Sequence, residues 1–196
     1  MGKPTIVSIL ATAICALLTS TSNAHETNAW PVQPTTKLEA LEIKTGTIIV
    51  KGITQMGGVS ASAGVLSVSC KEVTDASTGQ KESGIAIVFT VGGQQREMLQ
   101  VDYDELESLV KSLDYLCKVN GSVTTLNSFE AAYTTKGGLR LAAFTSKRTG
   151  GVGYAVRNTH ATMTPVPLTE PQFAMLRSLV EQAKGKLDGM RQGTAR

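Results

Sequence analysis

Apolar and polar residues alternate in short runs along the first half of the chain. In the run 65–73 an extended strand would carry three apolar residues on one face and three polar residues on the other, Leu66, Val68 and Cys70 against Ser67, Ser69 and Lys71. Similar runs lie at 47–53, 84–91 and 95–101, and residues typical of turns separate them. The pattern predicts four strands, and the short Gly92-Gly93 joint favours an antiparallel hairpin.

The spacing of apolar residues changes at the stretch VDYDEL, residues 101–106, from a period of two to about 3.6 residues. Asp102 is expected to cap a helix there, with Glu105 reaching back to the Asp102 amide in a capping box. Val101 and Leu106 would form the accompanying hydrophobic staple. The predicted helix carries one apolar stripe, made of Leu106, Leu109, Val110, Leu113, Leu116 and Cys117.

The second half of the chain repeats this order. Strand-like runs lie at 129–135, 139–146, 153–158 and 161–168. The stretch LTEPQF, residues 168–173, then repeats the helix-start pattern: Thr169 takes the cap, Gln172 the capping-box position, and Leu168 and Phe173 the staple. Leu176, Leu179 and Val180 continue the stripe of a second helix.

The chain therefore reads as an α+β protein built from two approximate ββββα units with antiparallel sheets. The first unit spans 38–120, the second spans 121–190, and a basic tail, 191–196, follows. Each amphipathic helix must bury its stripe, and the nearest apolar surface is the sheet of its own unit. We therefore expect each helix to pack on the sheet that precedes it.

The first residues are typical of a secretory signal peptide. Lys3 supplies a positive start, an apolar run follows, and Ser22-Asn23-Ala24 offers a small-residue cleavage site. We expect 1–24 to be removed, 25–37 to be a flexible leader, and the protein to be periplasmic or secreted. No later stretch is apolar enough to predict a membrane span.

Two cysteines remain after the expected cleavage, Cys70 and Cys117. An oxidising compartment allows a disulfide between them. The bridge would form if the strand face that carries Cys70 packs on the helix stripe that carries Cys117. The alternative is two buried free thiols, which behave as small apolar residues.

Charge is unevenly distributed along the chain. Residues 25–135 carry 8 Lys and Arg against 13 Asp and Glu, net −5, and residues 136–196 carry 10 against 3, net +7. In the second predicted sheet, alternation places Arg140, Ala142 and Phe144 on one face. Cations interleaved with aromatic rings are typical of polyanion-binding surfaces. The candidate anion-binding residues are Lys136, Arg140, Phe144, Lys147, Arg148 and Arg157.

The tandem ββββα order resembles that of the Whirly-type single-strand nucleic-acid-binding proteins. The resemblance covers element order only. It implies nucleic acid as one kind of polyanion for the basic half, but it assigns no binding residue.

Catalytic and metal-binding patterns are sparse. His160 stands alone in a predicted turn, so no set of ligands at zinc-site spacing forms. Gly58-Val59-Ser60-Ala61-Ser62 stops one glycine short of a nucleophile elbow and precedes no helix. The acids Asp102, Asp104, Glu105 and Glu107 fall in a first helical turn, where carboxylates offset the helix dipole. The sequence indicates no cofactor.

These patterns favour an exported, non-catalytic binding or scaffold protein, acting through a sheet face or through contacts with further copies of itself. Two alternatives stay open. The basic second half could bind a polyanion or nucleic acid. An exported hydrolase could instead assemble its site from distant residues, with His160 meeting a carboxylate and a hydroxyl in a cleft.

Overall fold

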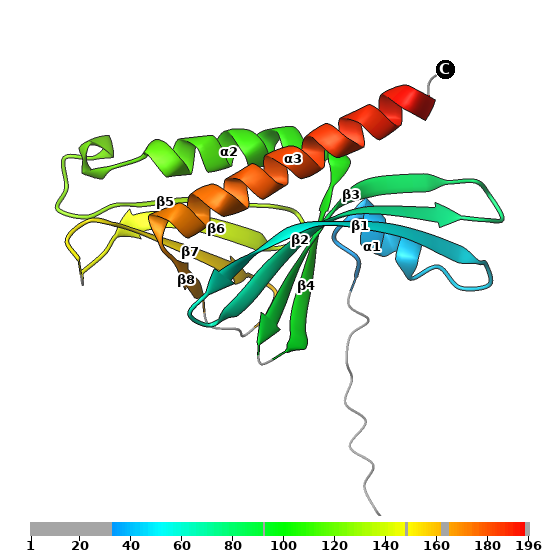
Figure 1. Ribbon diagram of the computed structural model, residues 1–196, viewed down its shortest axis with the longest axis horizontal. Helices are drawn as coiled ribbons and strands as arrows, with labels where there is room; N and C mark the ends of the chain where they lie inside the picture. The colour runs from blue at the N-terminus through cyan, green and yellow to red at the C-terminus, as the bar shows by residue number, and fades with distance from the viewer. Residues whose placement is uncertain (1–32, 92, 148, 162–164, 195–196) are drawn as a thin grey trace, which may run out of the picture. The chain divides into compact units, whose positions relative to one another are not determined.

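The computed structural model describes residues 33–91, 93–147, 149–161 and 165–194 (Figure 1). The predicted signal peptide, most of the predicted leader and Arg148 lie outside this part of the chain. Within it the α+β prediction is confirmed: two antiparallel four-stranded sheets are accompanied by helices.

The first sheet is a meander with strand order β1-β2-β3-β4. Its strands are β1 (Ile49–Ala61), β2 (Gly64–Asp75), β3 (Lys81–Val91) and β4 (Gln94–Asp102). Leu66, Val68 and Cys70 share a buried face of β2, as the alternation predicts. The register shifts between Gln55 and Gly57, where β1 carries a bulge.

The second sheet repeats the meander with strand order β5-β6-β7-β8. Its strands are β5 (Glu130–Thr134), β6 (Leu139–Thr145), β7 (Val152–Asn158) and β8 (Val166–Leu168). Its inner face is buried and consists largely of Leu139, Leu141, Ala143, Tyr154 and Val156. Alternation turns Arg140, Ala142 and Phe144 to the opposite, outer face.

The helices are α1 (Lys37–Glu42), α2 (Leu106–Lys118) and α3 (Glu170–Thr194), with short 3₁₀ turns at Tyr103–Glu105 and Gly121–Val123. Sequence periodicity predicted α2 and α3 but not α1. The six residues of α1 are too few to show a period, although a capping box between Thr36 and Glu39 marks the start of this helix.

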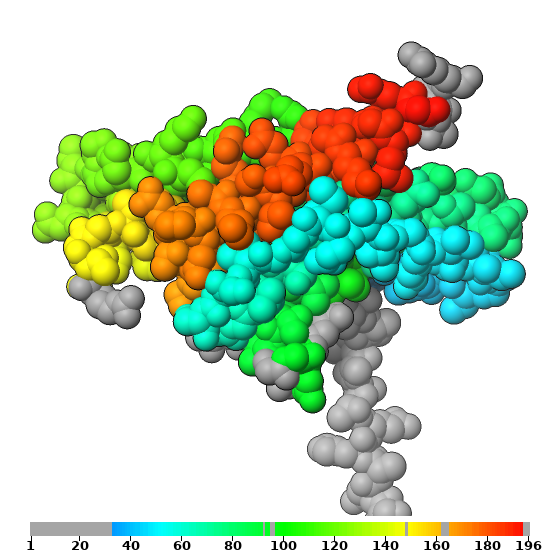
Figure 2. Space-filling model, in the orientation of Figure 1, coloured from blue at the N-terminus to red at the C-terminus, as the bar shows by residue number. Residues whose placement is uncertain are grey.

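Each of the two long helices packs mainly on the sheet of the other ββββα unit. α3 packs on β1, β2 and β3 of the first sheet, whereas α2 packs on β5 and β6 of the second, and the two helices contact each other. Figure 2 shows α3 lying directly against α2 along one side and against β1 and β2 along the other. The expectation that each helix covers its own sheet is therefore wrong, and one continuous core joins both sheets and both helices.

Specific contacts account for this exchange. The ring of Phe173, in the first turn of α3, stacks on Tyr154 of β7 with centroids 4.7 Å apart, so α3 begins at the second sheet. The side-chain amide of Gln172 donates to the Ser60 carbonyl at 2.6 Å, at the β1–β2 hairpin. With 25 residues, α3 is about 37 Å long and continues from there across the first sheet.

The repeated helix-start pattern has different outcomes in its two copies. Before α3 the capping box is confirmed: Thr169 N donates to Gln172 Oε1 at 2.8 Å, and Gln172 N donates to Thr169 Oγ1 at 3.4 Å. Before α2 it is wrong, because a 3₁₀ turn intervenes and Asp102 makes no side-chain cap there. The Asp102 carboxylate instead accepts from the amides of Lys37 and Leu38, at the start of α1.

The helix exchange also decides between the two cysteine alternatives. The Cys70 thiol lies under α3, where its Sγ donates to the Ala183 carbonyl at 3.5 Å. Cys117 belongs to α2, on the other sheet, and both thiols are free. The disulfide hypothesis is wrong because its premise paired the Cys70 face with the wrong helix. Among the described residues, no helix has the length and apolarity needed to cross a membrane.

Candidate anion-binding site

Two arginines face each other on the outer surface of the second sheet. Arg140 of β6 and Arg157 of β7 are directly paired in the antiparallel register. The next pair along the same face is Ala142 with Ala155. The small alanines leave the longer arginine side chains standing above the sheet at one end of this face.

The arrangement forms a hollow of about 300 Å³, which we call the arginine hollow. It is lined by Glu130, Arg140, Ala142, Phe144, Ala155, Arg157 and Pro165. Its volume is at the lower end of the range of ligand pockets, ~300–1,000 Å³. The alanine floor provides the space, and a larger side chain at either alanine would fill it.

The arginine hollow carries more positive than negative charge. The Glu130 carboxylate lies 2.5 Å from Nη2 of Arg140, whose Nη1 also donates to Thr134 Oγ1 at 3.4 Å. Among the described residues no carboxylate pairs with Arg157. Like charges directly opposite each other on neighbouring strands destabilise a sheet. The two guanidinium charges are therefore only partly compensated, by Glu130 at Arg140.

Phe144 lines the arginine hollow and also a second hollow. Its ring lies against Gly153, where an added Cβ would come within 3.0 Å of Phe144 Cε2. This second hollow has a volume of about 550 Å³, and we call it the hydroxyl hollow. It is lined by Ser62, Phe144, Ser146, Thr149, Val152, Gly153, Tyr154, Pro167, Leu168, Thr169, Glu170 and Gln172.

Three of the six candidate residues lie together in the arginine hollow: Arg140, Phe144 and Arg157. Lys136 does not line the hollow: its amide donates to Glu105 Oε1 at 3.0 Å, and its Nζ lies 3.7 Å from Asp104. Lys147 is exposed after the end of β6 and does not line the hollow either. Arg148 lies outside the described residues.

Sequence reasoning missed Glu130 and Ala155, and it placed Ala142 beside Arg140 and Phe144 without assigning it a role. The predicted strand at 129–135 includes Glu130, but only the register, which sets Glu130 opposite Phe144, shows which residues it meets. The alanines carried no chemical signal of their own. Their contribution is the space that they leave between larger neighbours.

Among the described residues, no catalytic set forms around the His160 ring. The ring lies beside Gly138, where an added Cβ would be 3.0 Å from His160 Nδ1, and the residue is exposed. No side chain of the described residues forms a hydrogen bond or ion pair with the ring. In the same part of the chain, no group of three or more His, Cys, Asp or Glu residues could hold a metal ion.

The acids near the start of α2 have structural partners. Asp104 accepts from Lys37 Nζ at 2.9 Å, and this hydrogen bond lowers the pKa of Asp104. Glu107 contacts Lys184 and Lys111, and the hydrogen bond from Lys184 lowers the pKa of Glu107. Together with the bonds of Asp102 and Glu105, these contacts give the cluster a structural role, mainly through partners outside α2. The predicted effect of these acids on the helix dipole stays a prediction.

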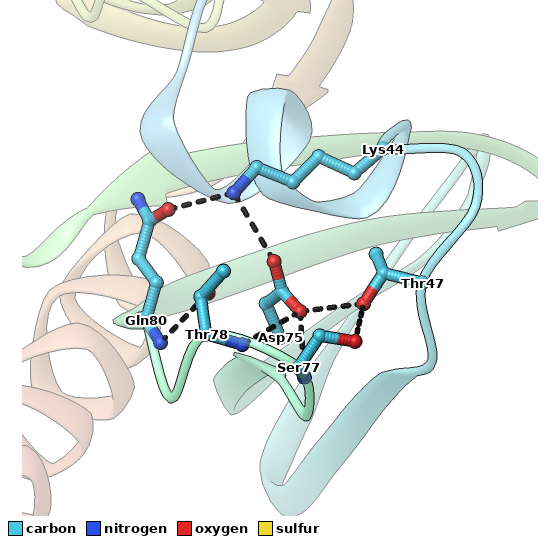
Figure 3. Close-up of polar contacts among 6 residues, drawn as sticks. All are labelled: Lys44, Thr47, Asp75, Ser77, Thr78 and Gln80. Carbon is cyan, nitrogen blue, oxygen red and sulfur yellow. Dashed lines mark hydrogen bonds and ion pairs between the residues drawn. The ribbon is translucent and has the colours of Figure 1, made fainter.

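Asp75 is the centre of a second polar cluster, at the β2–β3 turn (Figure 3). Its Oδ1 accepts from Thr47 Oγ1 at 2.6 Å and from Ser77 N at 3.0 Å, and its Oδ2 lies 3.3 Å from Lys44 Nζ. The bond from Thr47 is the main cause that holds the pKa of Asp75 below its usual range. These partners satisfy the carboxylate within the protein, so the cluster ties the loop before β1 to the turn.

Comparisons with known proteins assign no family to this chain. No family model matches it, and no curated protein matches it. One solved structure with some similarity is described as "Structure of the plant transcriptional regulator PBF-2"; the match has 13% identity and covers 77% of this chain and 88% of that one. Its TM-score is 0.25, which is too low to support an argument about fold or function.

Proposed function

We propose that this chain is an exported, non-catalytic binding protein that holds an anionic ligand in the arginine hollow. The observation that carries the proposal is the direct cross-strand pair of Arg140 and Arg157 above a floor of alanines. Glu130 partly offsets the charge of Arg140, and Arg157 has no carboxylate partner among the described residues. An anion held between the two guanidinium groups offsets the repulsion between their charges.

The chemistry of arginine also supports an anionic ligand. A guanidinium group is planar and offers several N–H donors in a fixed geometry, which suits carboxylate, sulfate and phosphate groups. Arg140 is held in place by Glu130 and Thr134, so little side-chain freedom is lost when it binds. The net charge of +7 in residues 136–196 favours the approach of an anion over longer distances.

Retention on a heparin resin tests the proposal. We expect Arg157→Gln to lower the salt concentration at which the protein elutes and to weaken binding of free heparin about tenfold, since a hydrogen bond to a charged group contributes about 1.5–3 kcal/mol. Lys147→Gln is the matched control, because it removes the same charge from an exposed position outside the arginine hollow. Equal shifts in both variants would show that binding depends on overall charge and not on this hollow.

Export is the second part of the proposal, and the sequence of residues 1–24 supports it. If the protein is exported by cleavage after Ala24, N-terminal sequencing of protein from the periplasm or the culture medium begins at His25. Recovery of the full-length chain in the cytoplasm alone would contradict the proposed export. It would not affect the proposal that the arginine hollow binds an anion.

A further inference from the structure

The arginine hollow and the hydroxyl hollow adjoin at Phe144, which lines both, and we call the two together the path. We infer that the ligand is an acidic polysaccharide whose carboxylates are separated by neutral sugars, with one carboxylate at the arginines and the chain continuing past Phe144 into the hydroxyl hollow. This inference rests on the proposed anion site and specifies the ligand for it. Three features of the path support it.

The first feature is the position of the Phe144 ring. Gly153 lies beneath it, and the absence of a side chain at this position allows the ring to lie against the sheet. A half-buried aromatic ring between two hollows offers an apolar surface to a ring that passes from one to the other. The apolar face of a sugar ring fits such a surface.

The second feature is the supply of hydroxyl groups in the larger hollow. Ser146 Oγ accepts from Thr149 N, and Thr149 Oγ1 accepts from Gly151 N, each at 3.4 Å. A hydroxyl that accepts in this way keeps its own proton for donation. Ser62 and Thr169 add two more hydroxyls to the lining. Such a surface suits the neutral hydroxyl groups of a sugar chain.

The third feature is the carboxylate of Glu170, which also lines the hydroxyl hollow. It stands in the first turn of α3, where the helix dipole favours its negative charge. Nucleic acid carries a phosphate on every nucleotide, so a strand that occupied both hollows would bring phosphates towards Glu170. A polysaccharide with neutral sugars between its carboxylates can place a neutral sugar beside Glu170, which lessens this repulsion. The charges of the path therefore favour the polysaccharide over a single-stranded nucleic acid.

Calorimetric titration with hyaluronan oligosaccharides tests the inference, because hyaluronan carries one carboxylate on every second sugar. We expect affinity to rise from the tetrasaccharide to the octasaccharide. Arg157→Gln should weaken every length about tenfold. Phe144→Leu should weaken the octasaccharide about two- to tenfold and the tetrasaccharide less than that. Thr149→Val, at the exposed β6–β7 turn, should act in the same length-dependent way.

Oligothymidylates of matched length serve as the competing ligand. We expect them to bind more weakly than hyaluronan and to gain affinity on Glu170→Gln, which should not strengthen hyaluronan binding. Tighter binding of oligothymidylate, or hyaluronan affinity that depends on Arg157 but not on length, overturns the polysaccharide inference and leaves the anion site standing. If neither hyaluronan, oligothymidylate nor heparin binds in a manner that depends on Arg157, the proposed function itself fails.

Discussion

At the scale of single residues, Asp75 makes the folded state sensitive to acid. Its folded-state pKa lies below the ordinary value of 3.8, chiefly because Thr47 donates a hydrogen bond to the carboxylate. A group with a lowered pKa stabilises the fold above its unfolded-state pKa and loses that contribution as the pH falls towards the folded-state value. The stabilisation is therefore present at neutral pH and declines below about pH 3.8.

We expect Asp75→Asn to lower the melting temperature by several degrees at pH 7, and the difference from the unmodified protein to shrink as the pH falls below about 3.8. Thermal melts across this pH range, followed by circular dichroism, measure both effects. Glu72→Gln is a suitable control on the same strand, because its contact with Lys81 is a more exposed pair of small expected value. A constant difference at all pH values would mean that ionisation of Asp75 does not stabilise the fold.

The candidate site shows what alternation along a strand can predict at this scale. It correctly set Arg140 and Phe144 on one face, because side chains of a strand alternate with a fixed period. It could not exclude Lys136, whose amide and ammonium group are engaged by Glu105 and Asp104 from the start of α2. Contacts between residues far apart in sequence depend on the packing of elements, and local patterns do not contain that information.

At the scale of elements, the two helix starts differ in what their cap residues stabilise. Asp102 is 2% exposed and receives two amides of α1, so its carboxylate fixes the first turn of a helix 64 residues earlier in the chain. We expect Asp102→Asn to increase amide hydrogen exchange in α1 strongly and in α2 only slightly. The loss of charge at a buried double acceptor should cost about 1–3 kcal/mol.

Thr169→Ala is the matched comparison, because Thr169 caps its own helix locally. It should cost about 1 kcal/mol and increase exchange in the first turn of α3. Hydrogen exchange measured by mass spectrometry on both variants separates the two cases. Faster exchange at the start of α2 in the Asp102 variant would contradict the assignment of Asp102 to α1.

At the scale of the whole molecule, the sequence predicted two ββββα units but not their exchange of helices. An apolar stripe shows which face of a helix is buried and not which sheet buries it, and both sheets offer an apolar face. The choice depends on contacts such as the Phe173 ring on Tyr154 and the Cys70 thiol at Ala183. Each of these contacts joins residues that lie far apart in the sequence, and a local pattern cannot relate such residues. The disulfide hypothesis was wrong for the same reason.

The exchange of helices makes each sheet depend on the other for its stability. α3 starts at Tyr154 of the second sheet and covers the first, so its loss would expose the core on both sides. We expect Phe173→Ala, at a fully buried position, to cost about 3–5 kcal/mol and to lower amide protection in β2 and β7 by the same amount. Met175→Ala, on the exposed side of α3, is the control and should change little. If β7 alone lost protection, the sheets would unfold independently, and the shared core would not make the molecule one cooperative unit.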